Sequence, residues 1–301
     1  MPPTMYTITE FQSQGATLRG RLYLNGTVKN APIVIMAHGF SATIGMTSDK
    51  FAEEFEKSGF AVLLFDHRNF GISDGEPRQE LNKWLQMKGY QDAIDHVITL
   101  KNIDPTRIAL WGDSMSAAEV LALGAMDSRI KVILGQVPAC GDKSAPADDD
   151  EKLFTAMVTY FNSGDFTAKP EIISGPLPVV SVDQKGTPSL LKPLTAFRWF
   201  IEYGGRHNSN WKNLATYVNP NAITFFHPAL CAKQIKAAVY LTIAPEDEMA
   251  SPIVAREVYD MIPGPKEVLE IEGGHFGLLY YPSDLFSKAS KGQCDFLKKY
   301  L

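Results

Sequence analysis

Short, uniformly apolar segments alternate with longer amphipathic segments along most of this chain of 301 residues, and this alternation limits the folds open to it. A strand that is buried on both faces loses its polar side, which is typical of a parallel sheet covered by helices. The pattern therefore predicts an α/β domain with right-handed crossover connections. The segments that we interpret as strands are residues 33–37, 61–65, 108–111, 132–137, 239–243 and 268–271.

Amphipathic segments between these strands predict helices, and an alternating pattern near the start predicts a hairpin. Residues 6–11 and 17–24 alternate apolar and polar side chains around Gln14-Gly15, which indicates two antiparallel strands with one buried face. The expected domain is thus a mostly parallel sheet that begins with an antiparallel hairpin and has helices on both faces. The predicted helices are residues 49–57, 84–100, 114–125, 252–261 and 283–300.

Residues 140–226 break this alternation. They hold an acidic run at 148–151 that opens a helical stripe, then an extended Pro/Gly segment and two aromatic-rich segments. We interpret them as a lid inserted over one edge of the sheet, so that residues 1–139 and 227–301 form the core. The acidic run is interpreted as a solvated helix start and not a metal site, because the helix dipole favours acidic residues there. An aromatic lid over the strand ends predicts an apolar pocket.

Charge and cysteine content restrict the partners and the compartment. Lys and Arg total 29 against 34 for Asp and Glu, a formal charge of -5 without a basic run, which argues against nucleic acid. No apolar run approaches the ~20 residues that span a bilayer, and no secretory signal is readable. Cys140, Cys231 and Cys294 are too widely spaced to indicate a disulfide framework or a zinc site. We expect a cytoplasmic protein.

A serine follows closely on the strand predicted at residues 108–111. Gly112-Asp113-Ser114-Met115-Ser116 leads from that strand into a helix of small residues, which is the arrangement of a nucleophile elbow. This tight turn needs small neighbours and presents the hydroxyl at a helix N-terminus, which favours developing negative charge. Ser116 stands where a second glycine is usual. The nucleophile position falls two residues after Gly112, so Asp113 is interpreted as a neighbour.

A serine hydroxyl is a poor nucleophile near neutral pH unless a base takes its proton and a carboxylate orients that base. Behind such an elbow the expected order along the chain is serine, then acid, then histidine. Glu246, Asp247 and Glu248 follow the fifth predicted strand, and His275 follows the last one. Because the carboxyl ends of these strands meet at one edge of the sheet, we predict a triad of Ser114, Asp247 and His275. Spacing leaves Glu246 and Glu248 as alternative acids.

Acyl transfer also needs hydrogen-bond donors directed at the tetrahedral oxyanion, and the loss of one costs ~10²–10³ in rate. One predicted donor is the backbone N–H of Met115, directly after the candidate nucleophile. The other is the N–H of Phe40, in the loop Ala37-His38-Gly39-Phe40 after the first parallel strand. Gly39 allows that backbone to pass close to a substrate, and the His38 side chain is interpreted as holding the loop.

Four motifs in this order resemble the α/β-hydrolase superfamily: residues 37–40, 66–75, 112–116 and 273–276. Within it, Asp66-His-Arg-Asn-Phe-Gly-Ile-Ser-Asp-Gly75 is similar to the dienelactone-hydrolase-like and X-Pro-dipeptidyl-peptidase-like branch, which includes fungal polyketide transferases. The resemblance covers nearly the whole chain outside the insertion. It implies an α/β-hydrolase fold with the triad roles at Ser114, Asp247 and His275. An internal ion pair between Asp66 and Arg68 is expected to fix the 66–75 loop.

These observations favour a serine hydrolase that cleaves an ester or thioester bond of a largely apolar small molecule through an acyl-enzyme, without metal or organic cofactor. An acyltransferase that moves a polyketide or similar acyl group to an alcohol or amine is the alternative. A non-catalytic ligand-binding protein is a second alternative, although simple binding does not require all three triad residues. An exposed apolar face on the insertion could serve a homodimer.

Overall fold

The computed structural model describes residues 5–24, 28–143, 150–164, 166, 171–219 and 226–301. Its main sheet has eight strands in the order β1-β2-β4-β3-β6-β7-β10-β11, and the last six of these pair in parallel. The mostly parallel α/β sheet is the one that the sequence predicts. The strands are β1 (Thr7–Ser13), β2 (Ala16–Tyr23), β3 (Ala31–Ala37), β4 (Ala61–Phe65), β6 (Ile103–Asp113), β7 (Ile130–Gln136), β10 (Ala238–Ile243) and β11 (Lys266–Glu270).

The first two strands form the predicted antiparallel hairpin. Ser13 pairs with Ala16 across a turn in which Gln14 and Gly15 have φ of 47° and 74°, the left-handed region that glycine adopts readily. The strand β2 also pairs antiparallel with β4, from Gly20 opposite Phe65 onwards. The hairpin therefore extends the sheet at one edge and leaves the carboxyl ends of the parallel strands open.

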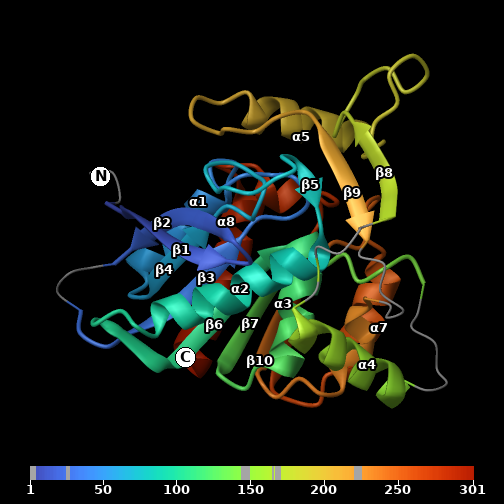
Figure 1. The fold of residues 1–301 in the computed structure, drawn as a ribbon. Coiled ribbons are helices and arrows are strands. Elements are labelled where there is room, and N and C mark those ends of the chain that lie inside the picture. The colour runs from blue at the N-terminus through green and yellow to red at the C-terminus, as the bar shows by residue number, and fades with distance from the viewer. Residues whose placement is uncertain (1–4, 25–27, 144–149, 165, 167–170, 220–225) are drawn as a thin grey trace.

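Helices cover both faces of the sheet. Figure 1 shows α2 and α3 in front of the strands and α1 and α8 behind them. Along β3, Ile35 belongs to the front core and Val34 to the rear core, so apolar side chains are required on both sides. The helices are α1 (Ser48–Lys57), α2 (Lys83–Val97), α3 (Met115–Met126), α6 (Pro228–Ala232), α7 (Pro252–Met261) and α8 (Asp284–Tyr300).

The region between β7 and α6 contains α4 (Asp150–Ser163), β8 (Glu171–Leu177), α5 (Leu194–Gly204) and β9 (Ala215–Asn219). Here β8 and β9 join β5 (Glu80–Leu81) in a small second sheet, which the sequence did not predict. The Trp199 indole of α5 donates to the Leu279 carbonyl at 3.1 Å and stacks on Phe276. The predicted insertion boundaries at 140 and 226 stay a prediction, and Asp148 and Asp149 of the acidic run lie outside the described residues.

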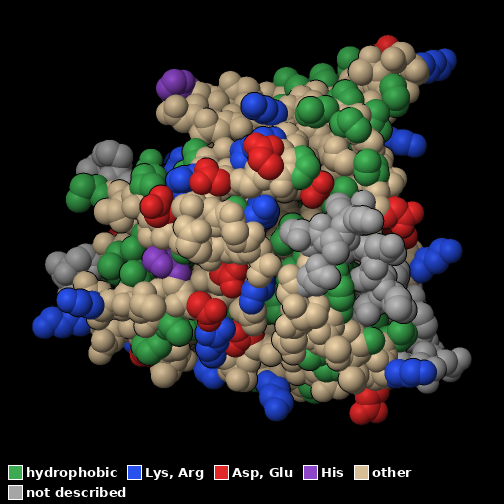
Figure 2. Space-filling view, viewed as in Figure 1, with side chains coloured by type: hydrophobic (Ala, Val, Ile, Leu, Met, Phe, Trp, Pro, Cys, Tyr) green, Lys and Arg blue, Asp and Glu red, His purple; other side chains and the backbone are tan. Residues whose placement is uncertain are grey.

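Apolar side chains gather on the outer surface of this region. Figure 2 shows them over α5, β8 and β9, above the charged surface of the core. The proposed homodimer stays a prediction. Within the described ranges, no helix has the length and apolar character needed to cross a membrane. The exposed large apolar side chains of this region are Ile172, Ile173, Val182, Leu194, Ile201 and Leu214.

Candidate active site

Ser114 occupies a sharp turn between β6 and α3. Its backbone has φ 54° and ψ -114°, a strained conformation for a residue with a side chain, and its N–H donates to the Gln136 carbonyl at 2.8 Å. Gly112 has no room for a side chain, because a Cβ there would lie 2.5 Å from the Ser116 carbonyl. The turn thus has the tightness expected of a nucleophile elbow.

The loops after β10 and β11 bring a carboxylate to an imidazole. His275 Nδ1 lies 2.7 Å from Asp247 Oδ2, and the two side chains are 5% and 2% exposed. The other oxygen, Asp247 Oδ1, accepts the N–H groups of Met249 at 2.7 Å and Ala250 at 2.8 Å. Three donors therefore fix this carboxylate in one orientation. The neighbouring Glu246 and Glu248 are exposed, and Glu248 reaches the Thr195 hydroxyl at 3.5 Å.

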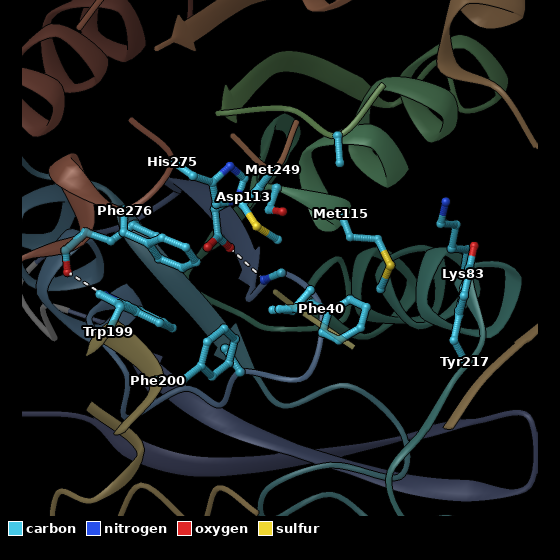
Figure 3. Close-up of a pocket in the computed structure, with 16 residues that line it drawn as sticks. Phe40, Lys83, Asp113, Met115, Trp199, Phe200, Tyr217, Met249, His275 and Phe276 are labelled. Atoms are coloured by element: carbon cyan, nitrogen blue, oxygen red, sulfur yellow. Dashed lines mark hydrogen bonds between the residues drawn. The ribbon is translucent and has the colours of Figure 1, made fainter. Parts of the chain in front are cut away.

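Ser114 and His275 line the same cavity of about 210 Å³ at the carboxyl edge of the sheet. Figure 3 shows His275 and Asp113 at one side of it and the rings of Phe40, Trp199 and Phe200 below. Most other walls are apolar, so bound apolar groups would be shielded from water. Those walls include Ala42, Met115, Ala139, Leu191, Met249, Phe276 and Leu279.

Two backbone N–H groups next to the elbow have no hydrogen-bond acceptor among the described residues. Phe40 has φ 42°, and among the described residues its N–H has no protein acceptor. Met115 is the first residue of α3, where a helix N–H lacks an intrahelical acceptor. Gly39 lets the first loop press against the elbow, because a Cβ there would lie 2.5 Å from the Asp113 carbonyl oxygen. Phe40 and Met115, the residues that carry the predicted oxyanion donors, both line the cavity.

Asp113 ties this loop to the elbow. Its Oδ1 accepts the Gly39 N–H at 2.7 Å, and its side chain is buried beside His275 (Figure 3). Burial raises the pKa of the Asp113 carboxyl, an effect that nearby His38 and His275 partly oppose. The carboxylate is therefore a structural partner of the residue that precedes Phe40, in agreement with its interpretation as a neighbour of the nucleophile position.

A second set of contacts explains the serine that replaces the usual glycine. Ser116 is fully buried, and its hydroxyl donates to the His38 carbonyl at 2.6 Å and lies 2.9 Å from His67 Nε2. The hydroxyl therefore links the start of α3 to the loop that carries Phe40. His38 Nε2 in turn faces Asp66 Oδ1 at 3.2 Å, which fits a side chain that holds the loop.

The expected Asp66–Arg68 ion pair is wrong. The Asp66 carboxylate instead accepts the N–H groups of Ile44 and Ile72, each at 2.9 Å. Arg68 donates to the Gln14 carbonyl at 2.8 Å, in the hairpin turn. Backbone N–H groups compete well for a buried carboxylate because they need no flexible side chain to be ordered, and a spacing of two residues gives no sign of that competition.

Lys83 also lines the cavity, a position that the sequence pattern did not predict. It is the first residue of α2, where the helix dipole disfavours a cation, and this position was the available signal. Arg198 and Arg206, in the aromatic-rich part of 140–226, lie outside this cavity. Arg206 stacks on Tyr203 at 3.6 Å, Arg198 is exposed, and neither lines the cavity.

Cysteines and metal-ligand residues do not form a centre in the described ranges. Cys140, Cys231 and Cys294 are all buried and unpaired. Burial raises the pKa of the Cys140 and Cys231 thiols to about 12, so both are protonated near neutral pH. Outside the undescribed stretches, no three His, Cys, Asp or Glu side chains are grouped so that they could hold a metal ion.

Comparison with known families assigns the fold. The model of the family described as "alpha/beta hydrolase fold" matches residues 32–282. The chain therefore belongs to the alpha/beta hydrolase fold family. Its structure also resembles the crystal structure of the alpha/beta hydrolase GrgF from Penicillium sp. sh18, with a TM-score of 0.75 and 23% identity over 98% of this chain and 99% of that chain.

Curated relatives carry several functional names. The chain is 28% identical to the quorum-quenching protein AidA of Acinetobacter baumannii (strain MDR-ZJ06), over 96% of this chain and 93% of that protein. It is 29% identical to polyketide transferase claH of Penicillium crustosum, over 98% of each chain. A shorter match, 42% identical over 44% of this chain and 42% of that protein, is to thiohydrolase aneE of Aspergillus aculeatus (strain ATCC 16872 / CBS 172.66 / WB 5094). The predicted resemblance to fungal polyketide transferases is confirmed.

Proposed function

We propose that the chain is a serine hydrolase that cleaves an ester or thioester bond, with Ser114 as nucleophile, His275 as base and Asp247 as the acid. One observation carries the proposal: His275 donates to a buried, fully bonded carboxylate and faces the same cavity as the strained Ser114. Simple ligand binding requires neither the strained serine nor the oriented imidazole.

The proposed reaction has two halves. His275 Nε2 takes the proton of Ser114 Oγ while that oxygen attacks the acyl carbon, and the N–H groups of Phe40 and Met115 receive the developing oxyanion. Collapse breaks the bond to the leaving alcohol or thiol, which takes the proton from His275. Water then attacks the acyl-serine by the same route, and the acid leaves. Asp247 keeps the proton on Nδ1 and stabilises the imidazolium.

The cavity and the relatives support the acyl substrate. The relatives named as thiohydrolase and polyketide transferase support a hydrolase-type enzyme that acts on acyl groups. A cavity of about 210 Å³ with apolar walls favours a largely apolar acyl group close to Ser114. We therefore assign a small, largely apolar acyl ester or thioester as the substrate class.

The test is covalent labelling of Ser114 with a fluorophosphonate, read by peptide mapping, together with hydrolysis of p-nitrophenyl esters of graded chain length. The expected result is stoichiometric label on Ser114 and loss of both label and hydrolysis in Ser114→Ala. Ser287→Ala, an exposed serine on α8, is the matched control and should behave as the unchanged protein. Folded protein that carries no label on Ser114 would remove the proposal.

Acyl transfer is the second candidate. It is favoured by the match to polyketide transferase claH over 98% of each chain. Both reactions share the acyl-serine and differ in whether water or an alcohol attacks it. Incubation with a thioester donor, with and without a series of alcohols, separates them: ester product in excess of free acid supports transfer, and free acid at all alcohol concentrations supports hydrolysis.

A further inference from the structure

A second cavity, of about 510 Å³, adjoins the one that holds Ser114. The two share Lys83, Ala139 and Tyr217 as lining residues, so these three form the junction between them. Figure 3 shows Lys83 and Tyr217 together at the end of the first cavity opposite His275. The walls of the second cavity also include the polar side chains of Asp142, Lys143, Asn219 and His227.

Lys83 is an ammonium group without a counter-ion in the described part of the chain. Its Nζ lies over the rings of Tyr217 and Phe226, 5.6 Å from each ring centroid. Such rings stabilise a cation but leave its hydrogen-bond donors free. For comparison, Lys88 on the same helix donates to Gln91 and lies 3.4 Å from Asp92.

Two acidic side chains lie near enough to Lys83 for its charge to lower their pKa, but neither forms an ion pair with it in the described ranges. Glu119 is fully buried, and burial holds the pKa of its carboxyl well above the usual range, although the charge of Lys83 opposes this effect. The Cys140 thiol is likewise kept protonated by burial. Asp142 also lines the second cavity, and within the described ranges no ion pair joins it to Lys83. Lys143 adds a further positive charge there.

Helix stability does not account for this lysine. A cation in the first turn opposes the helix dipole, at a typical cost of ~0.3–1 kcal/mol. The N–H groups of Trp84 and Leu85 in the first turn of α2 already donate to the Asn82 side chain, so this helix end needs no further partner. A partly desolvated charge in a cavity wall, without a structural partner, is a feature of ligand recognition.

We propose that Lys83 is a specificity-determining residue that binds an anionic group, a carboxylate or a phosphate, of an acyl substrate that extends from Ser114 through the junction into the second cavity. This inference rests on the proposed function for the position of the reacting bond. The anion lies either on the far end of the acyl group or on the leaving alcohol or thiol, and the ammonium binds it in both cases by charge-assisted hydrogen bonds.

The experiment uses two substrate pairs that differ in one charge. For the acyl side, the p-nitrophenyl monoester of adipic acid is compared with p-nitrophenyl hexanoate. For the leaving side, the hexanoyl thioester of 3-mercaptopropionate is compared with that of its methyl ester. Each is measured with the unchanged protein, Lys83→Met, Lys83→Arg and the matched control Lys88→Met. Methionine keeps an unbranched side chain only one atom shorter than that of lysine, and its uncharged end suits the helix N-terminus.

A charge-assisted hydrogen bond contributes ~1.5–3 kcal/mol, so its loss predicts a fall of ~10- to 100-fold. Lys83→Met should lower kcat/KM for the anionic member of one pair by about that factor, mainly through KM. The neutral members should stay within about threefold, Lys83→Arg should restore the preference and Lys88→Met should change neither. The affected pair identifies which side of the substrate carries the anion.

A binding measurement separates the two proposals. In Ser114→Ala protein, which does not turn over, Lys83→Met should weaken binding of the same anionic ester by ~10-fold or more. Unchanged anionic preference and binding in Lys83→Met would overturn the role of Lys83 while ester hydrolysis continued. Absence of hydrolysis with a Lys83-dependent anion affinity would overturn the proposed function alone.

Discussion

Replacement of Asp247 by asparagine tests the orientation of the base most directly. In the structure, Oδ1 of this carboxylate accepts two backbone N–H groups and Oδ2 accepts the Nδ1–H of His275. An asparagine has one oxygen and one NH₂ group. Two fixed N–H donors require its oxygen at the Oδ1 position, which directs the NH₂ group at His275 Nδ1.

The result would be the wrong tautomer of the base. Nδ1 would have to accept a hydrogen bond, so the proton would move to Nε2, where it blocks removal of the Ser114 proton. Loss of tautomer control in a triad lowers kcat by ~10⁴, which corresponds to about 5 kcal/mol of transition-state stabilisation. Because the two backbone donors keep their acceptor, the melting temperature should change little.

The assay is kcat and KM for a p-nitrophenyl ester, with thermal unfolding as a check on folding. Glu246→Gln and Glu248→Gln are the matched controls, since both side chains are exposed and lie in the same turn. Each should retain activity within about twofold, as surface substitutions have small effects. A loss of less than tenfold in folded Asp247→Asn, or a larger loss in Glu248→Gln, would refute the assignment of the acid.

Three further predictions follow from packing and burial. Gly39→Ala places a Cβ 2.5 Å from a backbone oxygen, so it should displace the Phe40 donor and lower kcat ~10²–10³-fold, as measured with the same ester. Burial raises the pKa of Glu119, so the folded state keeps a proton that the unfolded chain releases above about pH 4–5, and the contribution of Glu119 to stability falls as pH rises. The melting temperature of Glu119→Gln should therefore increase relative to that of the unchanged protein between pH 5 and 9. A difference that stays constant over this range would contradict the argument. Iodoacetamide at pH 8 should leave Cys140 and Cys231 unmodified in the folded protein, because burial raises their thiol pKa to about 12, and mass spectrometry with and without urea checks this.

Much of the core could be predicted from the sequence because its strands are buried on both faces. The segment predicted at residues 61–65 is the observed strand Ala61–Phe65, in which all five residues are buried. The sharp turn at residues 112–116 could also be predicted, because the strand, the small residues and the helix follow each other within a few positions. Local sequence determines such elements, and their order then brings the turns to one edge of the sheet.

The second sheet and the cation of the cavity could not be predicted in this way. Strand β9 pairs with β5, which is separated from it by more than 130 residues and contains only Glu80 and Leu81. So short a strand has no readable periodicity, and its pairing depends on the three-dimensional position of both segments. Lys83 follows Leu81 closely, and its place in the cavity wall depends on the same long-range packing.

The hydrogen bonds that hold the reactive groups join residues outside 140–226, namely Gly39 with Asp113, Ser116 with His38, and Asp247 with His275. The stretch 140–226 supplies cavity walls such as Trp199 and Tyr217. The residues that these bonds hold thus lie in the same part of the chain as Lys83, whereas 140–226 contributes only some of the cavity walls. Mutations within 140–226 can therefore reshape part of the cavity without removing any of these three hydrogen bonds, so a lineage can explore substrates while its reaction persists.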